Sequence, residues 1–166
     1  MPRVASPTVN DMLSEQLPRS PYDMVGGLVY FPRMFDKIRL HARGDLPEAY
    51  QNNLGRELDG YCLAFLHVKY ADVRERVLTG GSDEQILEWC LANGRRLGEG
   101  ESEIFNGFMQ KAGWRDAFSE RLAARLQESG LGRLDRRCWT RFDFIDLDEG
   151  RTPPDFRQWE LPRQGS

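Results

Sequence analysis

The sequence PRMFDKIRLHAR holds the densest group of side chains that can bind an anion or move a proton. Arg33, Lys37 and Arg39 are positively charged. Asp36 can hold an arginine in place, and His41 has a side chain that can serve as an acid or a base. Because the planar guanidinium of arginine matches a carboxylate or a phosphate through two parallel hydrogen bonds, this group is typical of an anion-binding site.

The spacing of these charges indicates that the helix carrying them needs a counter-charge. Arg33 and Lys37 lie four residues apart, and such a like-charge pair is unfavourable by about 0.2–0.5 kcal/mol on an isolated helix. A basic residue in the first turn also opposes the helix dipole. The counter-charge can come from a bound ligand, from a partner protein or from the chain itself. The internal candidates are the acids of the segment FDFIDLDEGR, which are Asp143, Asp146, Asp148 and Glu149.

Two functional hypotheses follow. The first is a non-catalytic binding protein that engages a small anionic ligand or a protein partner through what we call the basic face. That face consists of Arg33, Asp36, Lys37 and Arg39, with His41 beside it. The second is an enzyme that acts on a small anionic metabolite. In that case Arg33 and Lys37 hold the metabolite, and Asp36 or His41 serves as the acid or base.

A third hypothesis assigns no ligand to the basic face. Asp143, Asp146 or Asp148 would then neutralise its arginines in a salt-bridge network that only stabilises the fold. The surroundings of Arg33 distinguish the three hypotheses. Burial of Arg33 against Asp143 or Asp146 favours the structural role. Convergence of Arg33, Asp36 and His41 on an open cleft with room for a substrate favours the enzyme. A flat or convex face favours a protein partner.

Composition argues against several classes of protein. The chain has 166 residues, of which 40% are hydrophobic, and a formal net charge of −3. These values indicate a folded domain rather than a disordered chain or a nucleic-acid-binding protein. An uncharged run such as MVGGLVYFP is far too short to span a membrane, and the first residues include no apolar signal segment. We therefore expect a cytoplasmic protein with no nucleic-acid or membrane partner.

Neither a metal site nor a cofactor site is indicated. The two histidines, His41 and His67, have no ligand partner three or four residues away. No paired cysteine motif occurs among Cys62, Cys90 and Cys138. The first two fall among apolar residues at helical spacing, so we interpret them as reduced core residues. The segment DLDEGR does not match a calcium-binding EF-hand loop, and no phosphate-binding glycine loop is present, so we predict no metal and no cofactor.

Apolar residues recur at helical spacing along most of the chain. The segments that show this most clearly are 58–66, 70–78, 82–94, 102–113 and 118–126. Ser82 and Gln85 have the spacing of a capping box at the start of the third segment, and Ser102 is expected to cap the fourth. Residues 139–147 fit a strand and a helix about equally well.

These elements predict a mainly α protein, a compact single-domain bundle of about five to seven helices whose C-terminal segment is extended or a short strand. We divide the chain into a partly ordered N-terminal segment (1–16), a helical domain (17–151) and an extended, proline-containing tail (152–166). Trp159 in that tail would, if exposed, indicate docking of the tail on its own domain or on a second copy, so a homo-oligomer is one expectation.

The stretch PRSPYDMVGGLVYFPRM is predicted to form a helix that kinks or restarts at Pro32. Ser20 and Pro21 are typical of a helix start, and apolar residues follow them at helical spacing. The pair Gly26 and Gly27 is unfavourable in a helix by about 1 kcal/mol per glycine. We therefore expect another part of the protein, or a ligand, to pack closely against this pair.

Several phrases of the sequence are distinctive. They are PRSPYDMVGGLVYFPRMFDKIRL, NLGRELDGYCLAFL, GGSDEQILEWCLANGR, FNGFMQKAGWRD and FDFIDLDEGR. Together they resemble a bacterial family known as a domain of unknown function (DUF5069), over about Leu17 to Arg151. One departure is Phe105, which stands where the family pattern has tryptophan. The resemblance implies a single-domain, mostly helical bacterial protein, and it implies no reaction, cofactor or catalytic residue.

Overall fold

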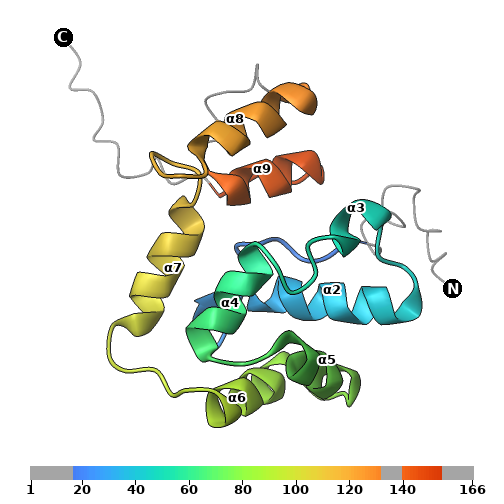
Figure 1. The fold of residues 1–166 in the computed structure, drawn as a ribbon, viewed down its shortest axis with the longest axis vertical. Coiled ribbons are helices and arrows are strands. Elements are labelled where there is room, and N and C mark those ends of the chain that lie inside the picture. The colour runs from blue at the N-terminus through green and yellow to red at the C-terminus, as the bar shows by residue number, and fades with distance from the viewer. Residues whose placement is uncertain (1–16, 132–139, 155–166) are drawn as a thin grey trace, which may run out of the picture.

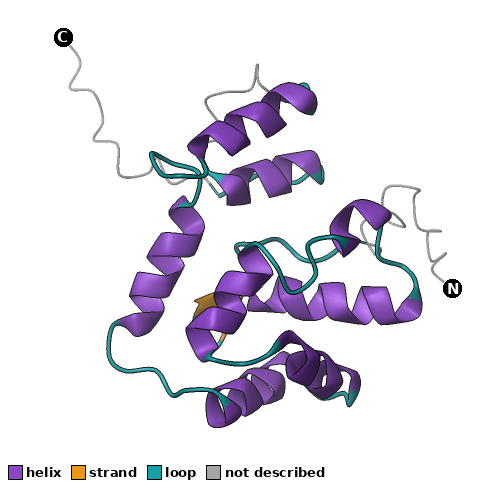
Figure 2. Cartoon of the chain, viewed as in Figure 1, coloured by secondary structure: helices purple, strands orange, loops and turns teal. Residues whose placement is uncertain are grey.

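The fold is mainly helical in the computed structural model, which describes residues 17–131 and 140–154 (Figures 1 and 2). Among these residues there are eight helices and one short antiparallel hairpin. The strands are β1 (Met24–Val25) and β2 (Leu28–Val29). The helices are α2 (Phe31–Arg43), α3 (Glu48–Gln51), α4 (Leu58–Leu66), α5 (Tyr70–Leu78), α6 (Asp83–Asn93), α7 (Glu101–Lys111), α8 (Ser119–Glu128) and α9 (Arg141–Asp148). The predicted mainly α class is confirmed, and the helices slightly exceed the expected number.

Helix α2 runs through the middle of the molecule, with α8 and α9 above it and α5 and α6 below it in Figure 1. It packs against α5, α6 and β1. The side chains of Phe31, Phe35 and Ile38 are at most 1% exposed. Leu40, which helical spacing places on the charged side of α2, is also buried, whereas Ala42 on the apolar side is exposed. Protein therefore covers part of the charged side of α2 as well as its apolar side.

The prediction of a helix between Pro21 and Pro32 is wrong, because the chain forms the β1–β2 hairpin there. Gly26 and Gly27 occupy its two-residue turn with φ values of 55° and 77°. Positive φ at both positions gives the turn the twist that a hairpin needs, and glycine adopts such values without strain. Pro32 stands in the first turn of α2, so the restart predicted at this proline is confirmed.

Capping boxes determine where α6 and α9 begin. The hydroxyl of Ser82 accepts the N–H of Gln85, whose side chain accepts the N–H of Ser82, as predicted. Thr140 and Asp143 make the same reciprocal contacts at the start of α9. These contacts satisfy amides that a helix would otherwise leave unpaired. The segment that fitted strand and helix equally well is therefore helical, and a short strand is wrong over α9.

Three smaller expectations have clear outcomes. Helix α7 begins at Glu101 after a glycine N-cap, so Ser102 does not cap it. Cys62 and Cys90 are buried and free, which confirms that they are core residues, whereas Cys138 lies outside the described residues. No helix in the described part of the chain is long and apolar enough to cross a bilayer.

The predicted terminal segments lie largely outside the described residues. Residues 1–16 are not among them, and of the tail 152–166 only 152–154 are. The division of the chain into three parts and the docking of Trp159 therefore stay predictions.

Gly26 and Gly27 give a matched pair of substitutions in the hairpin turn. A Cβ on Gly26 would lie 2.6 Å from Leu87 Cδ2 of α6, whereas nothing lies within 4 Å of a Cβ on Gly27. We expect Gly27→Ala to cost about 1–2 kcal/mol, the strain of a left-handed alanine. Gly26→Ala should cost about 1 kcal/mol more, because Leu87 has to move. Urea denaturation measures both losses, and equal values would contradict the close packing of Gly26 on α6.

Candidate anion-binding pocket

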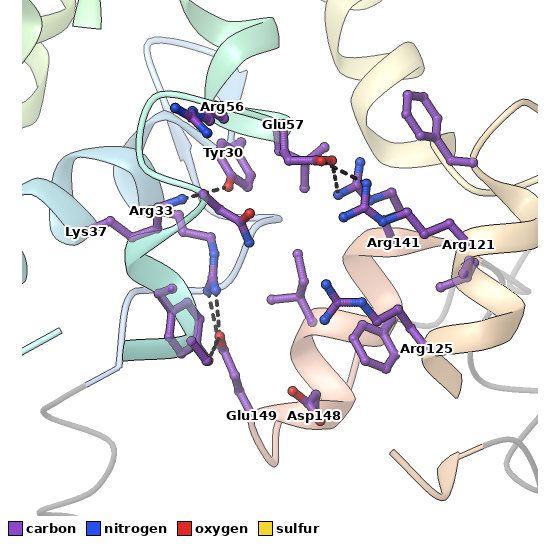
Figure 3. Close-up of a pocket in the computed structure, with 18 residues that line it drawn as sticks. Tyr30, Arg33, Lys37, Arg56, Glu57, Arg121, Arg125, Arg141, Asp148 and Glu149 are labelled. Carbon is purple, nitrogen blue, oxygen red and sulfur yellow. Dashed lines mark hydrogen bonds and ion pairs between the residues drawn. The ribbon is translucent and has the colours of Figure 1, made fainter. Parts of the chain in front are cut away.

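A cavity of about 190 Å³ lies between two groups of helices (Figure 3). One wall comes from α2, α3 and the residues that lead into them and into α4, and the other wall comes from α8 and α9. The positive lining residues are Arg33, Lys37, Arg56, Arg121, Arg125 and Arg141, and the negative ones are Glu57, Asp148 and Glu149. Positive side chains therefore outnumber negative ones in the lining of the cavity.

The guanidinium of Arg33 is held by an acid of the chain itself. Its Nη1 and Nη2 donate to the two carboxylate oxygens of Glu149 at 3.0 and 2.5 Å. Both side chains are 3% exposed. Nη1 also donates to the carbonyl oxygen of Arg19 at 2.8 Å. Among the acids of the segment FDFIDLDEGR, Glu149 is therefore the one that neutralises Arg33, through the parallel hydrogen bonds typical of an arginine–carboxylate pair.

Glu149 collects further donors at the end of α9. The hydroxyl of Tyr50 in α3 donates to its Oε1 at 2.7 Å, and Arg151 pairs with its Oε2. Burial opposes ionisation of this carboxyl, but the donors outweigh burial and hold the pKa of Glu149 below its usual 4.5. Burial and this carboxylate both raise the pKa of Tyr50. One carboxylate therefore ties α9 to α2 and α3.

Lys37 belongs to a second buried cluster in the same wall, with Asp59 and Tyr30. Its Nζ donates to Asp59 Oδ1 at 2.6 Å and to the Tyr30 hydroxyl oxygen at 3.4 Å, and that hydroxyl donates to Asp59 Oδ1 at 3.0 Å. The side chains of Lys37 and Asp59 are 4% and 0% exposed. Burial lowers the pKa of Lys37, although the Asp59 carboxylate favours the charged amine. The amine is therefore desolvated but well partnered.

Glu57, at the top of the cavity in Figure 3, holds two arginines from the other wall. Its Oε1 accepts Arg121 Nη1 at 2.8 Å, and its Oε2 accepts Arg141 Nη2 at 3.1 Å. Nη1 of Arg141 is buried and has no hydrogen-bond partner within the described residues. Arg56 and Arg125 line the cavity, and their side chains form no ion pair or hydrogen bond with any residue that the structure describes. These three arginines therefore have donors available to another group.

Two residues of the cavity wall have a strained backbone. Tyr30, directly before α2, has φ of 73°, and Glu57, directly before α4, has φ of 53° with ψ of −122°. Such conformations cost about 1–3 kcal/mol for residues other than glycine and persist only where the surroundings impose them. Strain of this kind clusters at functional sites, and here it occurs at the residues that contact Lys37 and the arginines of the opposite wall.

The five residues of the basic face do not converge on one site. Arg33 and Lys37, four residues apart, line the cavity. Asp36 and Arg39, three residues apart, lie on another side of α2 in a separate ion-pair cluster. His41 is partly exposed, and its side chain makes no hydrogen bond or ion pair with the described residues. The separate cluster consists of Arg19, Asp36, Arg39 and Asp83, with N···O distances from 2.5 to 3.3 Å.

Sequence reasoning missed the residues that complete the cavity. Glu57 and Asp59, and the arginines of α8 and α9, come from segments that we examined only for helical spacing. One signal was present, because Arg121 and Arg125 are a like-charge pair four residues apart, as are Arg33 and Lys37. The acids gave no comparable signal. Within residues 17–131 and 140–154, no group of three or more histidine, cysteine, aspartate or glutamate side chains is suited to a metal ion.

Two arginines of α2 provide a matched test of burial. Arg33→Ala leaves Glu149 buried without its main partner, and we expect the free energy of unfolding to fall by about 3–5 kcal/mol. Arg39, which is 30% exposed, pairs with Asp36 and Asp83, so Arg39→Ala should cost about 1 kcal/mol or less. Urea denaturation at neutral pH compares the variants. Similar losses would show that the buried pair holds the fold no more strongly than the exposed one.

The lowered pKa of Glu149 predicts how stability depends on acid. A carboxyl whose pKa is lower in the folded than in the unfolded chain stabilises the fold above the unfolded value, about 4.5, and this contribution is lost as the pH falls through the folded value. Glu149→Gln should therefore be less stable than the wild type at neutral pH, and the difference should shrink below about pH 4. Thermal unfolding of the wild type and of the variant across this pH range measures the difference in stability. A difference that does not change with pH would contradict a role for the ionised carboxylate.

Comparison with known proteins assigns the chain to a family. No curated protein matches it. The family model described as "Domain of unknown function (DUF5069)" matches residues 15–151, which include every residue that lines the cavity. Because this match covers most of the chain, and in agreement with the resemblance of its phrases, the protein belongs to the family of the domain of unknown function DUF5069.

Proposed function

We propose that this protein binds a small anionic ligand in the cavity between α2–α4 and α8–α9. The observation that carries the proposal is the set of arginine donors at this cavity that lack a partner among the described residues. They belong to Arg56, Arg125 and Nη1 of Arg141. Nη1 of Arg141 is buried, and an unpaired buried donor is unfavourable. A carboxylate or phosphate would pair with it, and with the exposed arginines beside it, through charge-assisted hydrogen bonds.

Two of the three arginines with available donors, Arg125 and Arg141, lie on the α8–α9 side of the cavity. Arg33 and Lys37 are neutralised by Glu149 and Asp59, so these pairs contribute little net charge. Two arginines share the single carboxylate of Glu57 on the other side. The anionic group of the ligand is therefore expected to bind there, and the two residues retained from the basic face form the facing wall.

The size and lining of the cavity restrict the ligand further. A volume of about 190 Å³ is below the roughly 300–1,000 Å³ of sites for drug-sized molecules. Apolar and aromatic side chains lie among the charges, and they are Leu58, Phe118, Leu122, Phe144 and Ile145. These side chains would cover an apolar part of a small ligand. A compact organic carboxylate or phosphate fits both the charge and the space.

A thermal-shift screen tests this function with phosphate, sulfate and small mono- and dicarboxylates. A ligand present at a hundred times its dissociation constant stabilises the folded state by about 2.7 kcal/mol. We expect such a shift in the wild type and its loss in Arg125→Ala, because this arginine is exposed and unpaired, so its removal leaves the fold intact.

Arg96→Ala is the matched control for Arg125→Ala. Arg96 is an exposed arginine outside the cavity that pairs with Glu88, so the variant removes the same charge at a distant place. It should keep the ligand-induced shift. A shift lost equally in both variants would indicate nonspecific attraction by net charge. No shift with any of these anions would contradict the proposed function.

A further inference from the structure

We propose that Lys37 is a reactive amine, and that it condenses with the carbonyl group of an anionic 2-oxo acid held in the cavity to form an imine. This inference rests on the proposed function, because the arginines must first bind the carboxylate. It goes beyond that function by assigning a covalent step and a class of substrate to the same site.

The position of Lys37 is the first argument. It lines the cavity, yet its side chain is only 4% exposed, and its Nζ contacts the carboxylate of Asp59 and the hydroxyl of Tyr30. Burial in such a place favours the neutral amine, which is the form that attacks a carbonyl carbon. Asp59 lies within hydrogen-bond distance to take the proton that the amine must lose.

The use of lysine at this position is the second argument. Of the 23 basic residues only three are lysine, namely Lys37, Lys69 and Lys111, and the rest are arginine. Lys69 and Lys111 are exposed, whereas Lys37 is buried beside the cavity. Arginine would also pair with a buried carboxylate, and it is better suited to doing so than lysine is. Arginine cannot form an imine, so a chemical role for the amine accounts for this exception.

The step balances without an oxidant, a reductant or a metal ion. The ammonium of Lys37 gives a proton to Asp59, and its lone pair forms a C–N bond while the C=O π electrons move to oxygen. Asp59 returns this proton to that oxygen, directly or through the Tyr30 hydroxyl, which gives one proton and takes one, and the oxygen becomes a hydroxyl. Proton transfer from the new C–N group through Asp59 to this hydroxyl lets it leave as water. The products are a protonated imine and one water molecule.

The opposite wall supplies the other half of the recognition. Arg125 and Arg141 lie across the cavity from Lys37 and Tyr30 (Figure 3). If a carboxylate binds these arginines, its oxygens face them. The carbon atom next to the carboxylate then lies on the side toward the middle of the cavity. In a 2-oxo acid the carbon next to the carboxylate is the carbonyl carbon. A 2-oxo acid therefore offers an anion to the arginines and an electrophile to Lys37 within one small molecule.

Reductive trapping tests the proposal on the unmodified full chain. The protein is incubated with pyruvate or phenylpyruvate and sodium borohydride, and peptide mapping by mass spectrometry locates the reduced adduct. We expect the adduct at Lys37, at a yield at least about tenfold above that at Lys69 or Lys111, because the arginines of the cavity hold the carbonyl group beside this amine and raise its local concentration. These two exposed lysines are controls within the same molecule, so the test does not depend on a variant that must fold.

Matched ligands and variants separate this inference from the proposed function. Lactate has the size and carboxylate of pyruvate but a hydroxyl in place of its ketone. Calorimetry should therefore detect lactate binding, and bound lactate should protect Lys37 from trapping by pyruvate. The variant Arg125→Ala still contains Lys37 but should give a lower yield of the adduct. The variant Lys37→Arg should give no adduct at residue 37.

Binding of lactate and pyruvate without an adduct at Lys37 would overturn the imine and leave anion binding standing. Equal labelling of all three lysines would overturn it as well, because any exposed amine would then suffice. If neither lactate nor pyruvate binds, and pyruvate forms no adduct, the assignment of 2-oxo acids is overturned. In that case the thermal-shift result with phosphate, sulfate and the other carboxylates would show whether anion binding itself fails.

Discussion

The bidentate ion pair between Arg33 and Glu149 is the contact on which the arrangement of the cavity depends. It joins the first turn of α2 to the residue directly after α9, although 116 positions separate them in the sequence. Both charges lose their water on burial, so such a pair stabilises a fold less than its attraction suggests, yet neither partner can be removed without leaving a buried charge. We therefore interpret it as a constraint on where α9 lies relative to α2. Tyr50 and Arg151 donate to the same carboxylate and strengthen that constraint.

The two walls of the cavity differ in how completely their charges are paired. On the α2 wall, Arg33 and Lys37 each have a buried carboxylate within 2.6 Å. On the α8–α9 wall, one carboxylate serves two arginines and a further arginine has no ion-pair partner among the described residues. We interpret this difference as the basis of the proposed anion binding. The strained backbone at Tyr30 and Glu57, one beside each set of charges, supports the same interpretation.

Local signals in the sequence predicted much of the fold, and charge spacing predicted part of the site. The capping box at Ser82 and the apolar spacing of α4 and α5 were sufficient because these depend on residues close in the sequence. The hairpin was missed because Gly26 and Gly27 were judged as helix residues, although two adjacent glycines also suit a hairpin turn. Frustrated charges on α2 correctly indicated a need for counter-charges. Which acids supply them depends on the tertiary arrangement, and Asp59 and Glu149 reach α2 from 22 and 116 positions away.

Because the cavity takes its walls from α2–α4 and from α8–α9, the order of synthesis limits when it can exist. A ribosome completes the first wall long before it makes the second, and the long-range contact that joins them forms only when α9 and the Glu149 that follows it have emerged. Until then Arg33 lacks Glu149, and the arginines of α8 and α9 are not yet part of the nascent chain. A ligand that needs both walls therefore binds only to the finished protein. Partial chains released early would neither compete for that ligand nor be stabilised by it, which leaves them open to proteolysis.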